Sequence, residues 1–480
     1  MKTEKKKVLL LAETGFIIRN LILGYFAEEI TKNYSLVVAV HRPNDSALQE
    51  LISNKDIEFI PFPMTSYKER RSLWQKVISW DNLMYGVQSA RKPNASLAIQ
   101  TKLFEGKSSL EKKVLQYSAI SFGKIIQWSL LNDWFDRLYL ERFILKKQAT
   151  SEWIGLLKEV RPVIVFSTML THSIRFRCSS DLPVVAAAYK MGIRTCTLVQ
   201  SWDNLSSKTS FLPSWIDRYF TWSNSMTDEL IMLNAGVCPD KVKVVGSPQY
   251  DFHLNADILE NRLAFLKRVG LKDTPYVVIG TGTARWMPDE MQKMVSLSRR
   301  ILKECPGMQV LIRLHPKDDG SRWANFEEEL KRLGVVIYCS APEVHMDLGG
   351  FSPSIDFYRD QVNTIFHSSV IINSSSSLTV DAAILNKPVI CIAYDLGKDE
   401  LFQEGRSLAY SKSVHYLAIV QTKGVWLATS EDECMLAVKS YHNDPSLNEP
   451  ERKMIVNLVA DRVDLIAGKR LANAVAQILS

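Results

Sequence analysis

One segment, residues 369–395, constrains the fold more than any other part of this chain. An apolar run at Val370–Ile372 ends in Asn373 and four consecutive serines, Ser374–Ser377, and a second apolar run follows at Val389–Ala393. Short apolar runs bounded by turn residues are typical of buried strands, and the residues between these two runs have helical spacing. The segment therefore predicts a strand, a turn, a helix and a strand, which form one parallel α/β unit.

The serine cluster lies where the helix of this unit is expected to begin. Serine is a preferred residue at a helix start, where free backbone N–H groups and the positive dipole end favour anions. Several hydroxyls gathered there can bind phosphate without a metal ion. One serine is enough to cap a helix, so four predict a phosphate site, with simple capping as the alternative. The predicted contacts are Asn373, Ser374, Ser375, Ser376 and Ser377.

Strand and helix patterns alternate along both halves of the 480-residue chain, which is too long for one ordinary core. One series opens at Lys6–Ala12 and another at Tyr276–Gly280, with a polar hinge region between residues 246 and 274. We predict an α/β protein of two Rossmann-like domains that face a cleft. The predicted parts are an N-terminal domain at 1–250 with a helical insertion at about 66–160, a C-terminal domain at 251–450, and a helix at 451–480 that crosses back to the first domain.

The predicted insertion concentrates the basic charge of the chain. Residues 66–148 contain 15 Lys and Arg against 7 Asp and Glu, a balance of +8, whereas the whole chain carries +7. Basic residues interleaved with aromatic ones suit a membrane interface or an anionic acceptor. The simpler interpretation is a solvated helical insertion whose aromatics pack inward, and peripheral membrane contact is the alternative. No nucleic-acid-binding motif is present, so no nucleic-acid partner is predicted. The tryptophans of this region are Trp74, Trp80, Trp128 and Trp134.

No sequence feature directs the chain across a membrane. No apolar run reaches the roughly 18–20 residues of a membrane span, and the run at Val8–Leu11 is too short for a signal-peptide core. The seven cysteines form no Cys-x-x-Cys pair, and most lie in apolar strand patterns, which is typical of reduced thiols. These features predict a cytoplasmic protein, located at the inner face of the cytoplasmic membrane if the insertion contacts lipid.

Three segments together resemble motifs of the GT-B class of glycosyltransferases. Val245–Asp251 is similar to the Gly-x-Pro-x-x-Asp element that closes the first domain in bacterial surface-polymer transferases. Arg313–Lys317 resembles their strand-end His-Pro motif, and the serine cluster with Asp381 resembles their serine motif. The order and spacing are similar to those of CDP-glycerol glycerophosphotransferases and of capsule sialyl- and Kdo transferases. The resemblance covers roughly residues 160–400.

The resemblance implies that the second domain binds a nucleotide-activated donor and the first domain an acceptor. Two departures leave the donor's base and sugar open. Gln200–Lys208 stands where the glycerophosphotransferases have a His-Gly motif. The acidic motif of the sialyltransferases has no obvious counterpart in the first domain.

In parallel α/β domains, the loops at the carboxyl ends of strands hold the reactive groups. His315 follows the strand pattern at Gln309–Leu314 and can share a phosphate with the serine hydroxyls, with an ordinary surface histidine as the alternative. A Gly-Thr-Gly-Thr-Ala-Arg run follows the strand pattern at Tyr276–Gly280 and brings small residues and an arginine toward a phosphate. Asp381 shares a helical face with Ser377, and we expect it to orient a serine or accept from a ribose or sugar hydroxyl. The predicted donor contacts in these loops are Thr281, Gly282, Thr283, Arg285, His315, Lys317 and Asp381.

Three residues of the first domain are candidates for the base that removes the acceptor proton. Asp203 follows the strand pattern at Arg194–Val199 and is favoured, with a turn or cap role as its alternative. His172 follows the strand pattern at Val163–Ser167, and Glu13 follows the first strand. The loop at Glu13 lacks a Gly-x-Gly-x-x-Gly fingerprint, and no Asp-x-Asp element lies in a strand-end loop. We therefore predict neither a dinucleotide cofactor nor a metal.

Together these features predict an inverting, metal-independent glycosyltransferase with no cofactor. It would move a sugar or polyol-phosphate unit from a nucleotide-activated donor to a bacterial surface glycan or a lipid-linked acceptor. One alternative is an enzyme similar to UDP-N-acetylglucosamine 2-epimerase on the same fold. Another is a non-catalytic scaffold of surface-polymer assembly, against which the intact His315, Asp381 and serine cluster argue.

Overall fold

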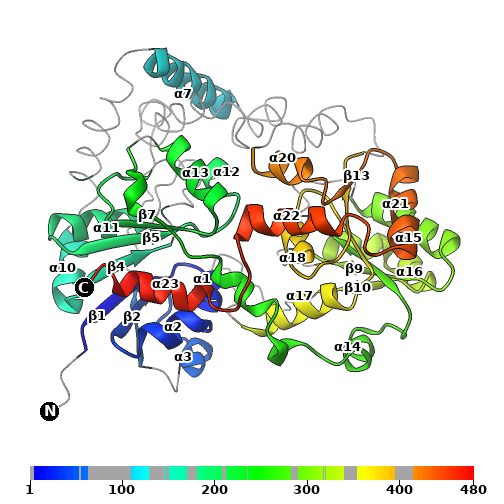
Figure 1. Ribbon diagram of the computed structural model, residues 1–480, viewed down its shortest axis with the longest axis horizontal. Helices are drawn as coiled ribbons and strands as arrows, with labels where there is room; N and C mark the ends of the chain where they lie inside the picture. The colour runs from blue at the N-terminus through cyan, green and yellow to red at the C-terminus, as the bar shows by residue number, and fades with distance from the viewer. Residues whose placement is uncertain are drawn as a thin grey trace. The chain divides into compact units, whose positions relative to one another are not determined.

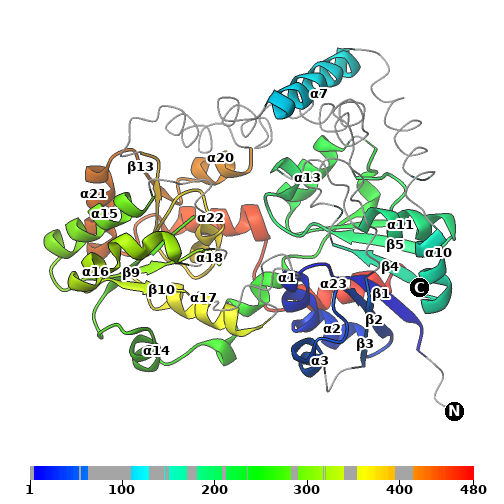
Figure 2. The same ribbon diagram turned by 180° about the vertical axis from the view of Figure 1, so that it is seen from behind.

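The computed structural model of the chain contains two compact units. Unit 1 comprises Met1–Pro248 with Ile466–Ser480, and unit 2 comprises Gln249–Leu465. Figures 1 and 2 show that each unit combines a sheet with surrounding helices. The described residues are 5–52, 56–62, 110–128, 145, 151–168, 170, 181–207, 212–234, 236–282, 290–316, 318, 320–339, 354–394 and 414–479.

Unit 1 is built on a seven-stranded sheet with the order β3-β2-β1-β4-β5-β6-β7. Every neighbouring pair of strands is parallel. The central strands are apolar and buried because both faces of a parallel sheet are covered. The strands are β1 (Lys7–Leu11), β2 (Ser35–Val40), β3 (Ile57–Pro61), β4 (Ile164–Ser167), β5 (Arg194–Leu198), β6 (Arg218–Thr221) and β7 (Val242–Val244).

Helices connect the successive strands of unit 1. The short helix α1 (Gly15–Ile17) continues into a π-helical turn, Ile18–Ile22. Two helices, α7 (Leu110–Trp128) and α10 (Ser151–Val160), are described between β3 and β4, where the sequence predicted a helical insertion. The other helices of this connected series are α2 (Tyr25–Ile30), α3 (Ser46–Ile52), α11 (Asp181–Lys190), α12 (Asn204–Ser207) and α13 (Asn224–Leu233).

The last helix, α23 (Ala467–Ala476), belongs to unit 1 and packs against α2. Arg470 Nε donates to the carbonyl oxygen of Val245 at 3.0 Å. Glycine is required at position 246 because its φ is +82° and a Cβ there would lie 2.8 Å from Arg470 Nη2 and 3.1 Å from Ala467 Cβ. The end of the chain is thus fixed to the segment that follows β7.

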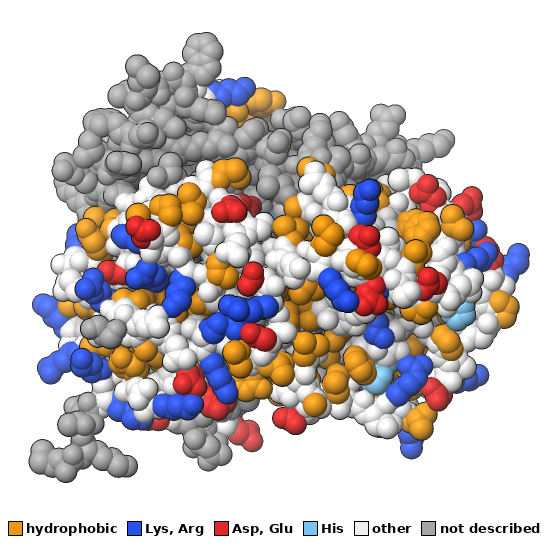
Figure 3. Space-filling model, in the orientation of Figure 1, with side chains coloured by type: hydrophobic (Ala, Val, Ile, Leu, Met, Phe, Trp, Pro, Cys, Tyr) orange, Lys and Arg blue, Asp and Glu red, His pale blue; other side chains and the backbone are white. Residues whose placement is uncertain are grey.

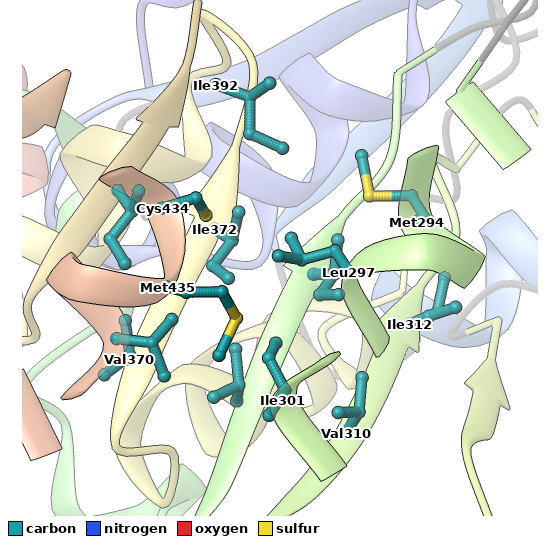
Figure 4. Close-up of a cluster of buried hydrophobic side chains, with 14 of the residues drawn as sticks. Met294, Leu297, Ile301, Val310, Ile312, Val370, Ile372, Ile392, Cys434 and Met435 are labelled. Atoms are coloured by element: carbon teal, nitrogen blue, oxygen red, sulfur yellow. The ribbon is translucent and has the colours of Figure 1, made fainter. Parts of the chain in front are cut away.

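Unit 2 has a six-stranded sheet with the order β10-β9-β8-β11-β12-β13, and every neighbouring pair is parallel. One face is covered by a hydrophobic core between the sheet and helices α15 and α21. Figure 4 shows this core, in which Met294, Leu297 and Ile301 lie beside Val310 and Ile312. The strands are β8 (Tyr276–Gly280), β9 (Gln309–Arg313), β10 (Val336–Tyr338), β11 (Val370–Asn373), β12 (Val389–Ile392) and β13 (Trp426–Ala428).

Most helices of unit 2 again alternate with strands, as the sequence predicted. A 3₁₀ turn at Pro248–Phe252 leads into the unit. The helices are α14 (Arg262–Val269), α15 (Glu290–Glu304), α16 (Ala324–Arg332), α17 (Asp356–Phe366), α18 (Leu378–Ile384), α20 (Val414–Gln421), α21 (Glu431–Asn443) and α22 (Glu449–Ala460).

The C-terminal region differs from the single helix expected over residues 451–480. It contains two helices, of which α22 packs against α18 in unit 2 and α23 packs in unit 1. Between them Asp461 and Leu465 have φ values of +60° and +64°, in the left-handed region that helices do not use. The residue types do not predict this break in the helix, because neither Asp461 nor Leu465 is glycine.

The predicted fold class, two Rossmann-like α/β domains, is confirmed by the two parallel sheets. Among the helices that the structure describes, none has the length and apolar character that a membrane crossing requires.

Candidate functional site

The loops after β8 and β11 are neighbours at the carboxyl edge of the unit 2 sheet. From β8 the chain continues to β9 and β10 on one side, then returns as β11 on the other side of β8. The two strands therefore form the topological switch point, where ligands of open α/β sheets bind. Gly280 ends β8, and a Cβ there would lie 2.4 Å from Leu378 Cδ2 at the start of α18. Glycine thus allows the two loops to pack closely.

The serine loop, residues 374–377, is a tight turn between β11 and α18. Ser375 has a φ of +43°, which a non-glycine residue adopts only when its surroundings enforce it. Asn373 Oδ1 accepts from the backbone N–H of Ser376 at 3.2 Å, and Ser376 Oγ accepts from the backbone N–H of Leu378 at 3.2 Å. Hydrogen bonds from the loop's own side chains therefore fix its conformation. The helix that follows, α18, is short, with seven residues.

Ser374 carries a hydroxyl that is buried and makes no hydrogen bond within the described part of the chain. A buried polar atom without a partner costs about 1–3 kcal/mol, so such atoms in native proteins call for an ion, a water or a ligand. The hydroxyl-bearing residues Ser375 and Ser377 are exposed on the same loop. The serine loop can therefore offer several O–H donors to an anionic group.

A chain of buried polar groups supports the serine loop from beneath. Asn373 Nδ2 donates to Thr379 Oγ1 at 3.1 Å, and Thr379 Oγ1 lies 2.8 Å from Tyr416 Oη. Tyr416 Oη also lies 3.4 Å from Cys391 Sγ on β12. Burial raises the pKa of Cys391 to about 11, so this thiol stays protonated near neutral pH. The network ties the serine loop to β12 and α20, and sequence reasoning identified only Asn373 of its members.

His315 follows β9, which is the strand next to β8. Its backbone N–H donates to Thr281 Oγ1 at 2.9 Å, and its side chain is half-buried. This contact joins two predicted donor contacts: Thr281 follows β8, which is next to β11, and His315 follows β9, which is two strands from β11. An imidazole can donate an N–H to a phosphate whether it is neutral or protonated.

Asp381 is buried one turn into α18, with 2% of its surface exposed. Its Oδ1 lies 2.7 Å from His253 Nε2, and its Oδ2 accepts from Gln361 Nε2 at 2.6 Å. Both carboxylate oxygens therefore have partners from other parts of unit 2. His253 and Gln361 carry no motif, so sequence reasoning did not identify them.

In unit 1, Glu13 follows β1 at the switch point of the first sheet, between β1 and β4. Its Oε1 lies 3.8 Å from Nε2 of His41, which follows β2. His41 Nδ1 is buried without a hydrogen-bond partner in the described residues. The structure therefore adds His41 to the surroundings of Glu13, a residue that the sequence pattern did not single out.

Asp203 lies after β5 and immediately before α12. It is half-buried, and its Oδ1 accepts from Ser201 Oγ at 2.6 Å. The neighbouring Trp202 and Asn204 are buried, at 8% and 0% exposure. This loop is thus a packed structure with a partly exposed carboxylate rather than a loose turn.

Four predicted site residues lie outside the described residues, namely His172, Thr283, Arg285 and Lys317. Across the described ranges, no group of three or more His, Cys, Asp or Glu side chains is arranged to hold a metal ion.

Comparison with known proteins supports the fold. No protein-family model matches the sequence, and a search of curated proteins found no match. MnaA from S. aureus, solved with UDP, superposes with a TM-score of 0.53 at 13% identity, covering 99% of this chain and 97% of that one. A putative UDP-N-acetylglucosamine 2-epimerase from Listeria monocytogenes has a TM-score of 0.53 at 11% identity, with coverage of 99% and 97%.

A third solved structure is the UDP-GlcNAc 2-epimerase from Neisseria meningitidis bound to UDP-GlcNAc. It has a TM-score of 0.52 at 12% identity and covers 98% of this chain and 100% of that chain. At such identities the likeness shows a shared two-domain fold, the one that GT-B enzymes have.

Proposed function

We propose that this chain is a glycosyltransferase whose unit 2 binds the phosphates of a nucleotide-activated donor. The observation that carries the proposal is the buried, unpartnered Ser374 hydroxyl, for which no hydrogen bond exists in the described residues, at the switch point of the unit 2 sheet. His315 and the exposed serines supply further donors at the same edge. The solved structures of the same fold that contain UDP or UDP-GlcNAc support a nucleotide-sugar as the ligand.

The proposed reaction inverts the configuration at the anomeric carbon of the donor sugar. Asp203 removes the proton of an acceptor hydroxyl, with Glu13 or His172 as the alternative base. The acceptor oxygen forms a bond to the anomeric carbon while the bond from that carbon to the donor phosphate oxygen breaks. The electron pair leaves with the nucleoside phosphate, whose charge the serine hydroxyls and His315 stabilise. For a polyol-phosphate unit, the acceptor oxygen instead attacks the phosphorus that carries the polyol. The bond from that phosphorus to the bridging oxygen of the donor breaks, and the electron pair leaves with the nucleoside monophosphate.

The reaction is proposed to need neither a metal nor a cofactor. Hydroxyl and imidazole N–H groups that are fixed before the donor binds can stabilise a leaving phosphate without reorganising. A chelator should therefore leave turnover intact, and strict dependence on Mg²⁺ would contradict this part of the proposal.

The acceptor is proposed to be a bacterial surface glycan or its lipid-linked precursor, reached at the inner face of the cytoplasmic membrane. Helix α7 supports this because one of its faces exposes apolar side chains, with Leu110 at 79%, Tyr117 at 60% and Ile125 at 65%. Figure 3 shows hydrophobic and basic side chains together at the place where α7 lies in Figure 1. Apolar and basic side chains on one helix suit an anionic membrane surface.

A 2-epimerase is the second candidate, because the similar structures from Listeria monocytogenes and Neisseria meningitidis are named as a putative UDP-N-acetylglucosamine 2-epimerase and a UDP-GlcNAc 2-epimerase. Both candidates need the donor phosphates held in unit 2, so the serine loop does not separate them. They differ in the product: a transferase moves the sugar to an acceptor, whereas a 2-epimerase returns a nucleotide-sugar of changed configuration.

The experiment that separates the candidates has two steps. A thermal-shift screen against UDP-, CDP-, CMP-, GDP- and dTDP-linked donors first identifies the ligand by stabilisation of the native state. The stabilising donor is then incubated with the protein, with and without a bacterial membrane extract, and the products are identified by NMR. Sugar found on a glycan or lipid supports the transferase, and a 2-epimer formed without extract supports the epimerase. If no donor stabilises the protein, neither enzyme is supported, and the non-catalytic scaffold is the remaining candidate.

A further inference from the structure

Two charged side chains on the first turn of α15 are completely buried. Glu290 and Lys293 are both 0% exposed, although the following turns of the same helix bury Met294, Leu297 and Ile301 in the apolar core. Charged residues are almost never fully buried unless they are paired. The groups that bind Glu290 and Lys293 therefore indicate the role of these two buried charges.

Glu290 holds the loop that follows β8. Its Oε1 accepts from the backbone N–H of Gly282 at 2.6 Å, and its Oε2 accepts from Arg322 Nη2 at 2.6 Å. The same Arg322 nitrogen donates to the carbonyl oxygen of Gly282 at 2.7 Å. Both polar groups of the Gly282 backbone are thus bound by the ion pair of Glu290, which is buried, and Arg322, which is partly exposed.

Arg322 also holds the loop that follows β9. Its Nε donates to Asp318 Oδ2 at 2.7 Å, and the backbone N–H of Asp318 donates to the carbonyl oxygen of His315 at 2.8 Å. Asp318 Oδ1 accepts from the backbone N–H of Gly320 at 3.1 Å. One guanidinium therefore connects the Gly282 and His315 loops.

Lys293 holds a third loop, the one after β12. Its Nζ donates to the carbonyl oxygen of Tyr394 at 2.5 Å and lies 5.1 Å from the centre of the Tyr394 ring. The first turn of α15 thus reaches the carboxyl-end loops of β8 and β12 directly, and that of β9 through Arg322.

Such buried charges are costly to the fold. Burial raises the pKa of Glu290, while the Gly282 N–H and the Arg322 guanidinium lower it. Replacing a buried ion pair by apolar residues of similar volume is often neutral or stabilising. Stability alone therefore does not account for four charged side chains, Glu290, Lys293, Asp318 and Arg322, at this one edge of the sheet.

We infer that Glu290, Lys293 and Arg322 are positioning residues, which act together as a clamp that presets the carboxyl-end loops around the proposed phosphate site of unit 2. The inference rests on the proposed function, because it assigns the clamp to the donor site. By fixing Gly282 and the backbone of His315, the clamp keeps the His315 imidazole and the Thr281 hydroxyl in place before the ligand arrives. The ligand class is a nucleoside diphosphate or its sugar ester.

Unit 2 offers a matched control for Arg322. Arg262 donates to Asp273 Oδ1 at 2.9 Å and to the carbonyl oxygens of Thr274 and His367. Thr274 precedes β8, so Arg262 lies at the amino edge of the same sheet, away from the phosphate-binding loops. Both arginines connect an aspartate to backbone carbonyl groups of unit 2, but only Arg322 does so at the proposed site.

The test compares Arg322→Gln with Arg262→Gln by calorimetric titration of UDP and by thermal unfolding. Both variants should lower the unfolding temperature, but only Arg322→Gln should weaken UDP binding, by at least about tenfold. If Arg322→Gln does not fold, Lys293→Met tests the clamp through its separate contact with the Tyr394 backbone. It should still fold, because methionine fills the space of the buried lysine stem, and it should bind UDP more weakly, because the Tyr394 backbone loses its contact with α15.

The outcomes separate this inference from the proposed function. Equal UDP affinity for Arg322→Gln and Arg262→Gln, or unchanged affinity in Lys293→Met, would overturn the clamp and leave the donor site standing. Wild-type protein that binds none of UDP, CDP, GDP or dTDP would overturn both.

Discussion

His253 Nε2 lies 2.7 Å from Asp381 Oδ1, and both side chains are buried, at 0% and 2% exposure. His253 follows the turn at Pro248–Phe252 that opens unit 2, whereas Asp381 lies on the helix behind the serine loop. The pair therefore fastens the first segment of unit 2 to the helix that carries the proposed phosphate site.

Removing His253 should destabilise unit 2. In His253→Ala, Asp381 loses one of its partners, and breaking a buried pair typically costs about 3–5 kcal/mol. Asp381→Asn should cost less because it keeps an acceptor oxygen for His253. If Asp381 only positions α18, Asp381→Asn should also keep its donor affinity. Urea unfolding and calorimetry measure the two effects, and a cost below about 0.5 kcal/mol for His253→Ala would contradict the assignment.

Asp203→Asn should separate chemistry from donor binding. The loss of a general base lowers the rate by about 10²–10⁴-fold, while the donor contacts in unit 2 are unchanged. We therefore expect near-normal nucleotide affinity and a large fall in turnover number, measured by calorimetry and by initial rates with saturating donor. Near-wild-type turnover would transfer the role to Glu13, for which Glu13→Gln is the next variant, or to His172.

The free energy of unfolding should depend on pH at pH values below the ordinary pKa of histidine, because of His367. Burial lowers the pKa of His367 below its usual value of about 6.5, and nearby Arg262 and Lys387 act in the same direction, while hydrogen bonding to the Glu260 carbonyl opposes them. The unfolded chain therefore binds a proton at a higher pH than the folded chain does. The stability that the neutral imidazole contributes is complete above about pH 6.5 and is lost as the pH falls through the lower folded value.

The measurement is the free energy of unfolding of the wild type and of His367→Gln over a pH range that extends about two units on either side of the ordinary histidine pKa of about 6.5. The wild type should lose stability relative to the variant on the acid side. A difference that is constant with pH, or that grows on the alkaline side, would show that His367 is not held neutral.

Membrane contact through α7 predicts salt-sensitive binding to anionic liposomes. Each basic residue near an anionic surface contributes about 1 kcal/mol, so co-sedimentation should fall steeply as salt is added. Tyr117→Glu and Ile125→Glu place charge on the exposed apolar face and should weaken binding. Met454→Glu is the control because Met454 is also exposed, at 53%, but lies in unit 2. No binding at low ionic strength would leave α7 and the basic segment as ordinary packing.

Much of the fold could be predicted because buried parallel strands are short apolar runs that stand out in a sequence. The apolar runs Val370–Ile372 and Val389–Ala393 predict two such strands, and the structure has strands at Val370–Asn373 and Val389–Ile392. The break at Asp461 could not be predicted, because it depends on a left-handed backbone that most often belongs to glycine.

The candidate site was predictable in part for a similar reason. Local motifs identified the serine loop and His315, which lie next to strands in the sequence. The clamp and the His253–Asp381 pair join residues that are distant in sequence, 32 apart for Glu290 and Arg322 and 128 apart for the pair. Nothing in one sequence shows which buried charges meet, so these contacts required the structure.

The central claim is that donor phosphates bind the serine loop, and the most direct test is calorimetric titration of nucleotide donors against Ser374→Ala. Ser247→Ala is the matched control, since Ser247 also carries a buried hydroxyl with no partner in the described residues but lies in unit 1. Removing either hydroxyl should preserve or raise the unfolding temperature.

Only Ser374→Ala should bind the donor more weakly, by about 10–150-fold, the loss expected when one hydrogen bond worth about 1.5–3 kcal/mol to a charged group is removed. Donor affinity in Ser374→Ala equal to that of Ser247→Ala and the wild type would contradict the account.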